Sequence, residues 1–178
     1  MTIIETLLQT HPIRKSKAQK KAFREWFVEE AAHMGYTATV HTKGSNNNLV
    51  VGDPETAQVT YTAHYDTPAV MPLPNFITPK NLLMYILYQL LIVFVFLVVC
   101  MGSGILVGWL TKEPLWGSLA SMVAWFALLI LMLAGPANKN CANDNTSGVA
   151  AVMEIIARLP EAERRKAAFI LFDNEELG

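Results

Sequence analysis

The sequence predicts an α/β protein whose sheet domain is interrupted by a transmembrane hairpin. A strand (58–63), a helix (149–159) and a second strand (167–172) follow one another, an order typical of a parallel sheet with a crossover helix. Between the first strand and the helix, residues 81–138 are dominated by two long apolar stretches. We therefore expect a mixed, largely parallel sheet with two membrane-spanning helices inserted into it.

The composition locates the membrane part and excludes several classes of protein. Of the 178 residues, 52% are hydrophobic and 16% are charged, whereas an ordinary soluble domain has roughly 25% charged residues. The deficit is local, since no charged residue lies between Lys80 and Lys112 or between Glu113 and Lys139. The apolar content excludes a disordered chain, and the formal net charge of −1 argues against nucleic-acid binding. Two cysteines cannot build a disulfide framework.

The N-terminal part is predicted to begin with two helices. Residues 2–10 form a short apolar-rich helix, which Pro12 separates from the next. Ser16 and Gln19 have the spacing of a capping box, and the amphipathic helix that follows is expected to end at Gly35.

Charge and alternation patterns describe the next segments. The basic run over residues 14–24 is expected to be a solvated helix face. Residues 36–41 alternate apolar and polar side chains as a strand does. Asn46 to Asn48 are interpreted as a turn, and residues 49–51 as a second short strand. The continuous apolar run at 167–172 is typical of a strand that is covered on both faces.

Two apolar segments predict a transmembrane hairpin. Residues 82–110 and 115–135 both exceed the roughly 20 residues that a helix needs to cross a bilayer, and the polar turn 111–114 separates them. Trp109 and Trp116 flank this turn as interfacial aromatic residues do. Small residues suited to a close helix–helix approach are Gly102, Ser103, Gly104 and Gly108. The alternative, a hairpin buried in a soluble core or a dimer interface, is disfavoured because neither segment has a polar face.

The hairpin sets the domain organisation. A hairpin returns the chain to its starting side, so residues 1–80 and 139–178 can fold together around the insertion at 81–138. The sequence has no secretory signal, which favours a multi-pass membrane protein with both termini and the α/β part in the cytoplasm. Lys80 and Lys139 at the outer ends, against Lys112 in the turn, agree with this orientation. The lipid bilayer is thus an expected partner.

Acidic and imidazole side chains gather at the ends of the predicted elements. His64 and Asp66 follow one strand, Asp144 precedes the helix, and Glu175 and Glu176 follow the last strand. In open α/β sheets, ligands bind in the crevice beyond the carboxyl ends of the strands. One crevice is therefore expected to receive all five side chains.

These residue types suit zinc or a similar divalent metal. Imidazole and carboxylate groups are its ligands, a His-x-Asp pair lets the aspartate orient the ring, and one of two adjacent glutamates can act as a general base. Each piece alone has a simpler reading: a structural histidine, a helix N-cap at Asp144, or a solvated pair of glutamates. The combination at matching element ends favours the metal site.

Three motifs carry a resemblance to a known family. They are TAHYDTPA at residues 62–69, NDNTSGVAAVMEI at 143–155 and AFILFDNEELG at 168–178. At these residues the chain resembles the co-catalytic zinc aminopeptidases, which include bacterial leucyl aminopeptidases, aminopeptidase Y and glutamate carboxypeptidase. The resemblance implies a phosphorylase/hydrolase-like zinc-peptidase fold, incomplete at its C-terminal end.

The resemblance also implies a role for each residue. His64 would ligate one of two zinc ions, Glu176 the other, and Asp144 would bridge both. Glu175 would be the base that activates water, and Asp66 would orient the site behind His64. The implied reaction is hydrolysis of a peptide substrate, typically with release of its N-terminal residue.

Two departures from the family limit this expectation. The family joins the His-x-Asp motif to the bridging aspartate by a short soluble loop, where this chain has the hairpin. The family also takes one more acidic ligand and one more histidine from beyond the Glu-Glu motif. Each zinc would then have two of three protein ligands, so we expect this polypeptide alone to bind metal poorly and turn over little. We also expect a fragment of a longer product, with strand 167–172 as an exposed edge.

Other functions remain open from the sequence. A catalytically inactive, membrane-anchored peptidase-like module for binding or assembly would carry the same motifs. A transporter or channel element is disfavoured because the apolar segments carry no ionisable residue. The sequence leaves open the oligomeric state, the metal used and the preferred substrate residue.

Overall fold

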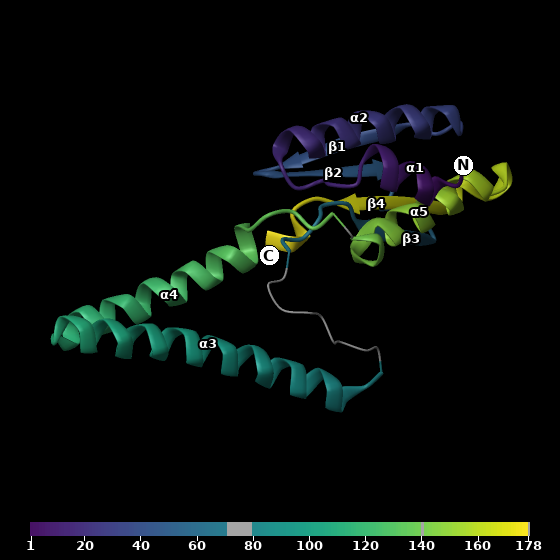
Figure 1. Ribbon diagram of the computed structural model, residues 1–178. Helices are drawn as coiled ribbons and strands as arrows, with labels where there is room; N and C mark the ends of the chain where they lie inside the picture. Colours follow the sequence, from purple (N-terminus) through teal and green to yellow (C-terminus); the bar gives the residue numbers. More distant parts are fainter. Residues whose placement is uncertain (71–79, 140, 178) are drawn as a thin grey trace. The chain divides into compact units, whose positions relative to one another are not determined.

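The computed structural model describes residues 1–70, 80–139 and 141–177 (Figure 1). The chain divides into two compact units. One comprises Met1–Pro68 and Ala137–Gly178, and the other is Ala69–Pro136. The first contains a sheet with its helices, and the second contains two long apolar helices.

The first unit is a mixed α/β structure around a four-stranded sheet in the order β1-β2-β4-β3. The strands are β1 (Ala38–Lys43), β2 (Asn46–Val51), β3 (Val59–His64) and β4 (Ala167–Phe172). Only β3 and β4 run parallel, whereas β1–β2 and β2–β4 are antiparallel. The prediction of a mixed sheet is confirmed, but the prediction that it is largely parallel is wrong. The cause is the tight β1–β2 hairpin, which can only join antiparallel strands.

The position of β4 corrects a second prediction. Leu49 to Val51 of β2 pair with Phe169 to Leu171, while β3 pairs along the opposite side of β4. β4 therefore lies in the centre of the described sheet, and its expected place at an exposed edge is wrong. The edge strands are β1 and β3. The prediction that β4 is covered on both faces agrees with its mostly buried side chains.

Three helices pack onto the sheet and one another. They are α1 (Ile3–Thr10), α2 (Lys17–His33) and α5 (Ser147–Arg158). The expected capping box is present, because Ser16 accepts the Gln19 amide and the Gln19 side chain accepts the Ser16 amide. α2 contacts β1, and α5 contacts β3 and α1. Side chains from these helices and from β2, β3 and β4 share one hydrophobic core, which includes Phe27, Phe169 and Ile156.

The predicted turn at Asn46 to Asn48 is wrong. Lys43 pairs with Asn46, so the hairpin loop consists of Gly44 and Ser45. Gly44 has φ +62°, a left-handed conformation that glycine adopts without steric cost. Two of the asparagines are kept in β2 by hydrogen bonds with Asp173. The Asp173 carboxylate accepts the Asn47 amide, and the Asp173 amide donates to the Asn48 side chain. Asparagine usually indicates a turn, but here it provides these side-chain and backbone contacts.

The basic run over residues 14–24 is not uniformly solvated as predicted. Arg14 is 0% exposed and Lys20 is 7% exposed, whereas Lys17 and Lys21 are exposed. The two buried cations face inward because backbone carbonyls and carboxylates of other segments receive them. Apart from the His11 carbonyl, these partners lie far away in sequence, so the local charge pattern does not reveal them.

The second unit is a helical hairpin of α3 (Leu82–Thr111) and α4 (Pro114–Ala134). Both helices are long and apolar enough to cross a membrane, as predicted. In each, only 6% of the residues in the most apolar window are buried, which argues against the core of a soluble protein. Lys112 and Glu113 join the two helices.

Small residues bring α3 and α4 together. A Cβ added to Gly117 would lie 2.6 Å from the carbonyl oxygen of Gly104, and one added to Gly104 would lie 3.0 Å from that of Gly117, so larger side chains here would push the backbones apart. Near it, the Ser121 hydroxyl donates to the Cys100 carbonyl across the helix pair at 2.8 Å. Gly102, by contrast, faces open space and takes no part in the contact.

Candidate metal centre

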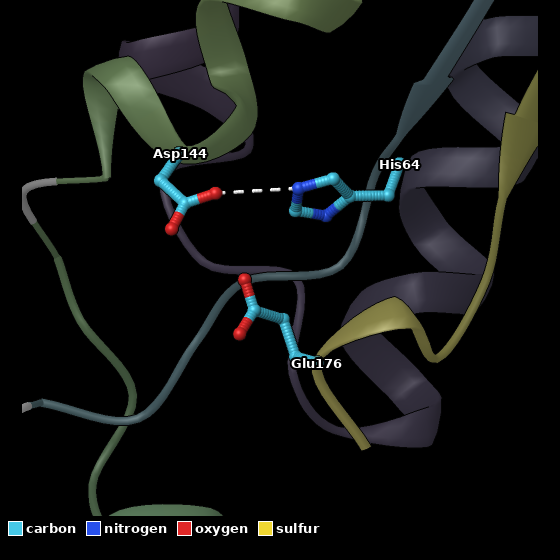
Figure 2. Close-up of side chains that lie close together, drawn as sticks. All are labelled: His64, Asp144 and Glu176. Atoms are coloured by element: carbon cyan, nitrogen blue, oxygen red, sulfur yellow. Dashed lines mark ion pairs between the residues drawn. The ribbon is translucent and has the colours of Figure 1, made fainter. Parts of the chain in front are cut away.

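Three side chains from separate segments converge at the carboxyl ends of β3 and β4 (Figure 2). His64 is the last residue of β3, Asp144 precedes α5, and Glu176 lies in the turn that follows β4. One ligand atom of each lies within 4.8 Å of those of the other two. Among the residues that the structure describes, this is the one such group of three or more. These are the three residues that the sequence predicts as metal ligands.

The two ring nitrogens of His64 face different partners. One faces the cluster, and the other faces Asp66. Its Nε2 lies 3.3 Å from Asp144 Oδ1 and 3.8 Å from Glu175 Oε2. Its Nδ1 is buried and lies 3.4 Å from Asp66 Oδ1, slightly longer than an ordinary hydrogen bond. The Asp66 carboxylate, followed by Glu175 and Asp144, raises the pKa of His64 to about 8 against the opposing effect of burial. Nε2 is thus the atom available to a metal.

Asp66 links the histidine to the glutamate turn. Its side chain is nearly fully buried and accepts the backbone N–H groups of Glu175 and Glu176 at 3.2 and 3.1 Å. Burial alone would raise the pKa of Asp66, but interaction with His64 and the Glu176 amide lowers it below its ordinary value. One carboxylate therefore contacts the ring of His64 and accepts the backbone amides of both glutamates.

Glu176 is a carboxyl group in a poorly solvated, acidic surrounding. Burial, followed by the repulsion of Asp144, raises the pKa of Glu176 to about 7. The free energy of such a carboxylate is lowered when it is protonated or when it binds a cation. Glu175 is more exposed, with 60% of its side chain accessible, yet its carboxylate still reaches the rim of the cluster. The two glutamates thus occupy different environments.

Asp144 is held in the cluster by the segment around it and does not cap α5. Its amide donates to the Cys141 carbonyl at 3.1 Å, and its backbone is not helical, with φ −135° and ψ 85°. The Asp144–Asn145 peptide bond is cis. The side chain that accepts a first-turn amide of α5 is Asn145, which receives the Gly148 N–H at 3.0 Å. The alternative reading of Asp144 as an N-cap is therefore wrong.

A buried ion pair supports the glutamate turn from behind, and sequence reasoning missed it. Lys20 Nζ donates to Asp173 Oδ1 at 2.7 Å and to the Asn174 side chain. The other Asp173 oxygen accepts the Asn47 amide at 3.1 Å. Asp173 lies two residues before Glu175, and this closeness to the predicted glutamates was a local signal for it. Lys20 gave none, because it lies within a run of basic residues whose sequence does not distinguish buried from exposed members.

The comparisons with known proteins add no relative. No family model, curated protein or solved structure matches this chain. The assignment of the site therefore depends on its own geometry. Ligands at about 2.1 Å from a tetrahedral zinc stand about 3.4 Å apart, and the His64–Asp144 separation of 3.3 Å already fits this value. Glu176, within 4.8 Å, needs a shift of about an ångström, which side-chain rotation can provide.

Proposed function

We propose that this chain is a membrane-anchored metallopeptidase module of the zinc aminopeptidase type, with His64, Asp144 and Glu176 as zinc ligands. The observation that carries the proposal is the convergence of these three side chains from three separate segments. The imidazole and carboxylate donors match those of zinc hydrolases. The second support is Asp66, because a carboxylate behind a ligating histidine is a recurring feature of such sites.

The chain's own residues divide the catalytic work. A zinc ion at these ligands would polarise a substrate carbonyl and make water more acidic. Glu175 then serves as the general base, since its carboxylate lies at the rim, 3.8 Å from His64 Nε2, and is not buried. Asp66 keeps Glu175 in place by holding its amide. The substrate class that follows from the resemblance is a peptide with a free amino end.

The two-helix hairpin suggests how the module meets the membrane. α3 and α4 are apolar and long enough to span a bilayer, which makes lipid their natural surroundings. We place the α/β unit on the cytoplasmic side, on the grounds of the flanking lysines and the orientation rule given above.

A single ion with an open coordination position fits the described ligands best. The resemblance implies two zinc ions. Three ligand residues, of which one aspartate is shared, would give each ion only two protein ligands. The described residues offer no further group of this kind. This shortage favours one second candidate, a module that binds metal or a partner without turnover. Ligands from further sequence or another chain would complete the two-ion site.

Metal content and hydrolysis together test the proposal. The full chain is purified in nanodiscs, loaded with zinc and assayed on aminoacyl fluorogenic substrates, alongside His64→Ala and Glu175→Gln. We expect His64→Ala to lose zinc, and Glu175→Gln to keep it while losing any hydrolysis. Zinc binding with no hydrolysis in the parent chain would support the inactive module. Equal zinc content in the parent chain and His64→Ala would refute the metal site.

A further inference from the structure

A fully buried arginine lies behind the candidate metal centre. Arg14 precedes α2 and is 0% exposed. Its guanidinium donates in three directions: Nε to the Tyr65 carbonyl, Nη1 to the His11 carbonyl at 2.6 Å, and Nη2 to the Thr146 hydroxyl at 2.9 Å. It also lies over the ring of Phe23, 5.4 Å from the centroid. Every branch of the side chain is thus occupied.

These contacts join two of the segments that carry ligands. Tyr65 lies between His64 and Asp66, and Thr146 lies two residues after Asp144. The main chain of Arg14 strengthens the first attachment, because its amide donates to the Thr67 hydroxyl and its carbonyl accepts the Thr67 amide. One residue therefore spans the gap between the segment of His64 and the segment of Asp144.

The charge of Arg14 gains nothing from burial itself, because burying a cation costs free energy unless it is paired. No carboxylate of the described residues lies within ion-pair distance of the Arg14 guanidinium. The guanidinium instead donates to two carbonyls and a hydroxyl of neighbouring loops. Because it is planar and has five N–H donors in fixed directions, it can fix the relative positions of these three acceptors.

We propose that Arg14 is a positioning residue that sets the separation of His64 and Asp144 and so prepares the metal site. This inference rests on the proposed zinc site. Without the guanidinium, the segments around Tyr65 and Thr146 lose their common support, and the 3.3 Å approach of the two ligands is no longer enforced.

The test uses Arg14→Met, which keeps most of the volume and removes the donors. Exposed Arg158, paired with Glu154 on the surface of α5, provides the control Arg158→Met. Cobalt is titrated into each full-length protein in nanodiscs and followed by its visible absorption, which reports ligand geometry. We expect Arg14→Met to bind cobalt about 10–100-fold more weakly, as loss of outer-shell support typically does. It should also melt at a lower temperature, because two carbonyls and a hydroxyl lose their donor. Arg14→Lys should give only partial rescue, since it retains the charge but not the fork.

Hydrogen exchange gives a readout that needs no metal. Deuterium uptake of the peptides that contain residues 65–67 and 141–147 should rise in Arg14→Met and stay unchanged in Arg158→Met. If Arg14→Met fails to fold, Thr146→Val removes one acceptor and should weaken cobalt binding in the same direction. Unchanged cobalt affinity and unchanged exchange in the folded variants would overturn the inference. Absence of cobalt binding in the parent chain would instead remove the proposed metal site, while exchange still decides whether Arg14 holds the two segments.

Discussion

Replacing Asp66 by asparagine separates positioning from ligation. The substitution keeps the shape of the side chain but leaves one oxygen and one NH2 group where two oxygens now accept the amides of Glu175 and Glu176. One glutamate amide then loses its acceptor and faces a donor. The Nδ1–H of His64 also loses its anionic partner at 3.4 Å. None of the three proposed ligands is changed.

The expected magnitude follows from these contacts. A buried donor left unsatisfied costs about 1–3 kcal/mol, which corresponds to a fall in melting temperature of about 2–12 °C for a chain of this size. Loss of the carboxylate behind a ligating histidine lowers metal affinity by about 10–100-fold. We therefore expect Asp66→Asn to fold, to melt at a lower temperature and to bind zinc at least about tenfold more weakly.

The pH of the assay matters because protons compete with zinc. The raised pKa values of His64 (about 8) and Glu176 (about 7) mean that both ligands are partly protonated at neutral pH. Zinc affinity of the parent chain should therefore rise between about pH 6 and about pH 8.5, with protons released on binding. Asp66→Asn also removes the group that raises the His64 pKa, which reduces this competition. The zinc affinities of the parent chain and Asp66→Asn should therefore be compared at about pH 8.5, where His64 and Glu176 are mostly deprotonated in both proteins.

The measurement is competition with a chromogenic zinc chelator, together with thermal unfolding. Asp53→Asn is the matched control, because Asp53 also accepts hydrogen bonds but from an exposed loop. It should leave zinc affinity unchanged. Equal zinc affinity for Asp66→Asn and the parent chain at about pH 8.5 would refute the positioning role of Asp66.

Two further predictions concern the support of the glutamate turn and the membrane hairpin. Lys20→Met leaves the buried Asp173 carboxylate with Arg24, 3.9 Å away, as its remaining cation, and should cost up to about 3–5 kcal/mol in urea unfolding. Lys21→Met, which breaks an exposed pair, should cost under about 1 kcal/mol. Similar losses for both variants would contradict the assignment. Gly104→Leu should force α3 and α4 apart, seen as a longer distance between spin labels on the two helices, and Gly102→Leu should not. An unchanged distance in Gly104→Leu would show that the glycine contact does not set the helix spacing.

Local sequence patterns placed the elements, but pairing between distant segments decided their arrangement. The strand at 167–172 was predicted with its observed bounds because a buried apolar run is a local signal. Its central position depends on β2, which pairs with it across more than a hundred residues, and no local pattern encodes that partner. The same holds for Arg14 and Lys20, whose burial depends on acceptors far away in the sequence.

The candidate site was more predictable than the sheet. His64, Asp144 and Glu176 each follow or precede an element, and strand ends of one sheet lie at a common rim. Their convergence therefore needed only the element boundaries and the parallel pairing of β3 with β4. The sequence did not indicate that Asp66 accepts the backbone amides of Glu175 and Glu176, because these contacts depend on loop conformation.

X-ray absorption at the zinc edge, on the full chain in nanodiscs, tests the central claim most directly. We predict a first shell of nitrogen and oxygen at about 2.0–2.2 Å, with the scattering of one imidazole that disappears in His64→Ala. A shell that contains sulfur, or one that is unchanged in His64→Ala, would contradict the account.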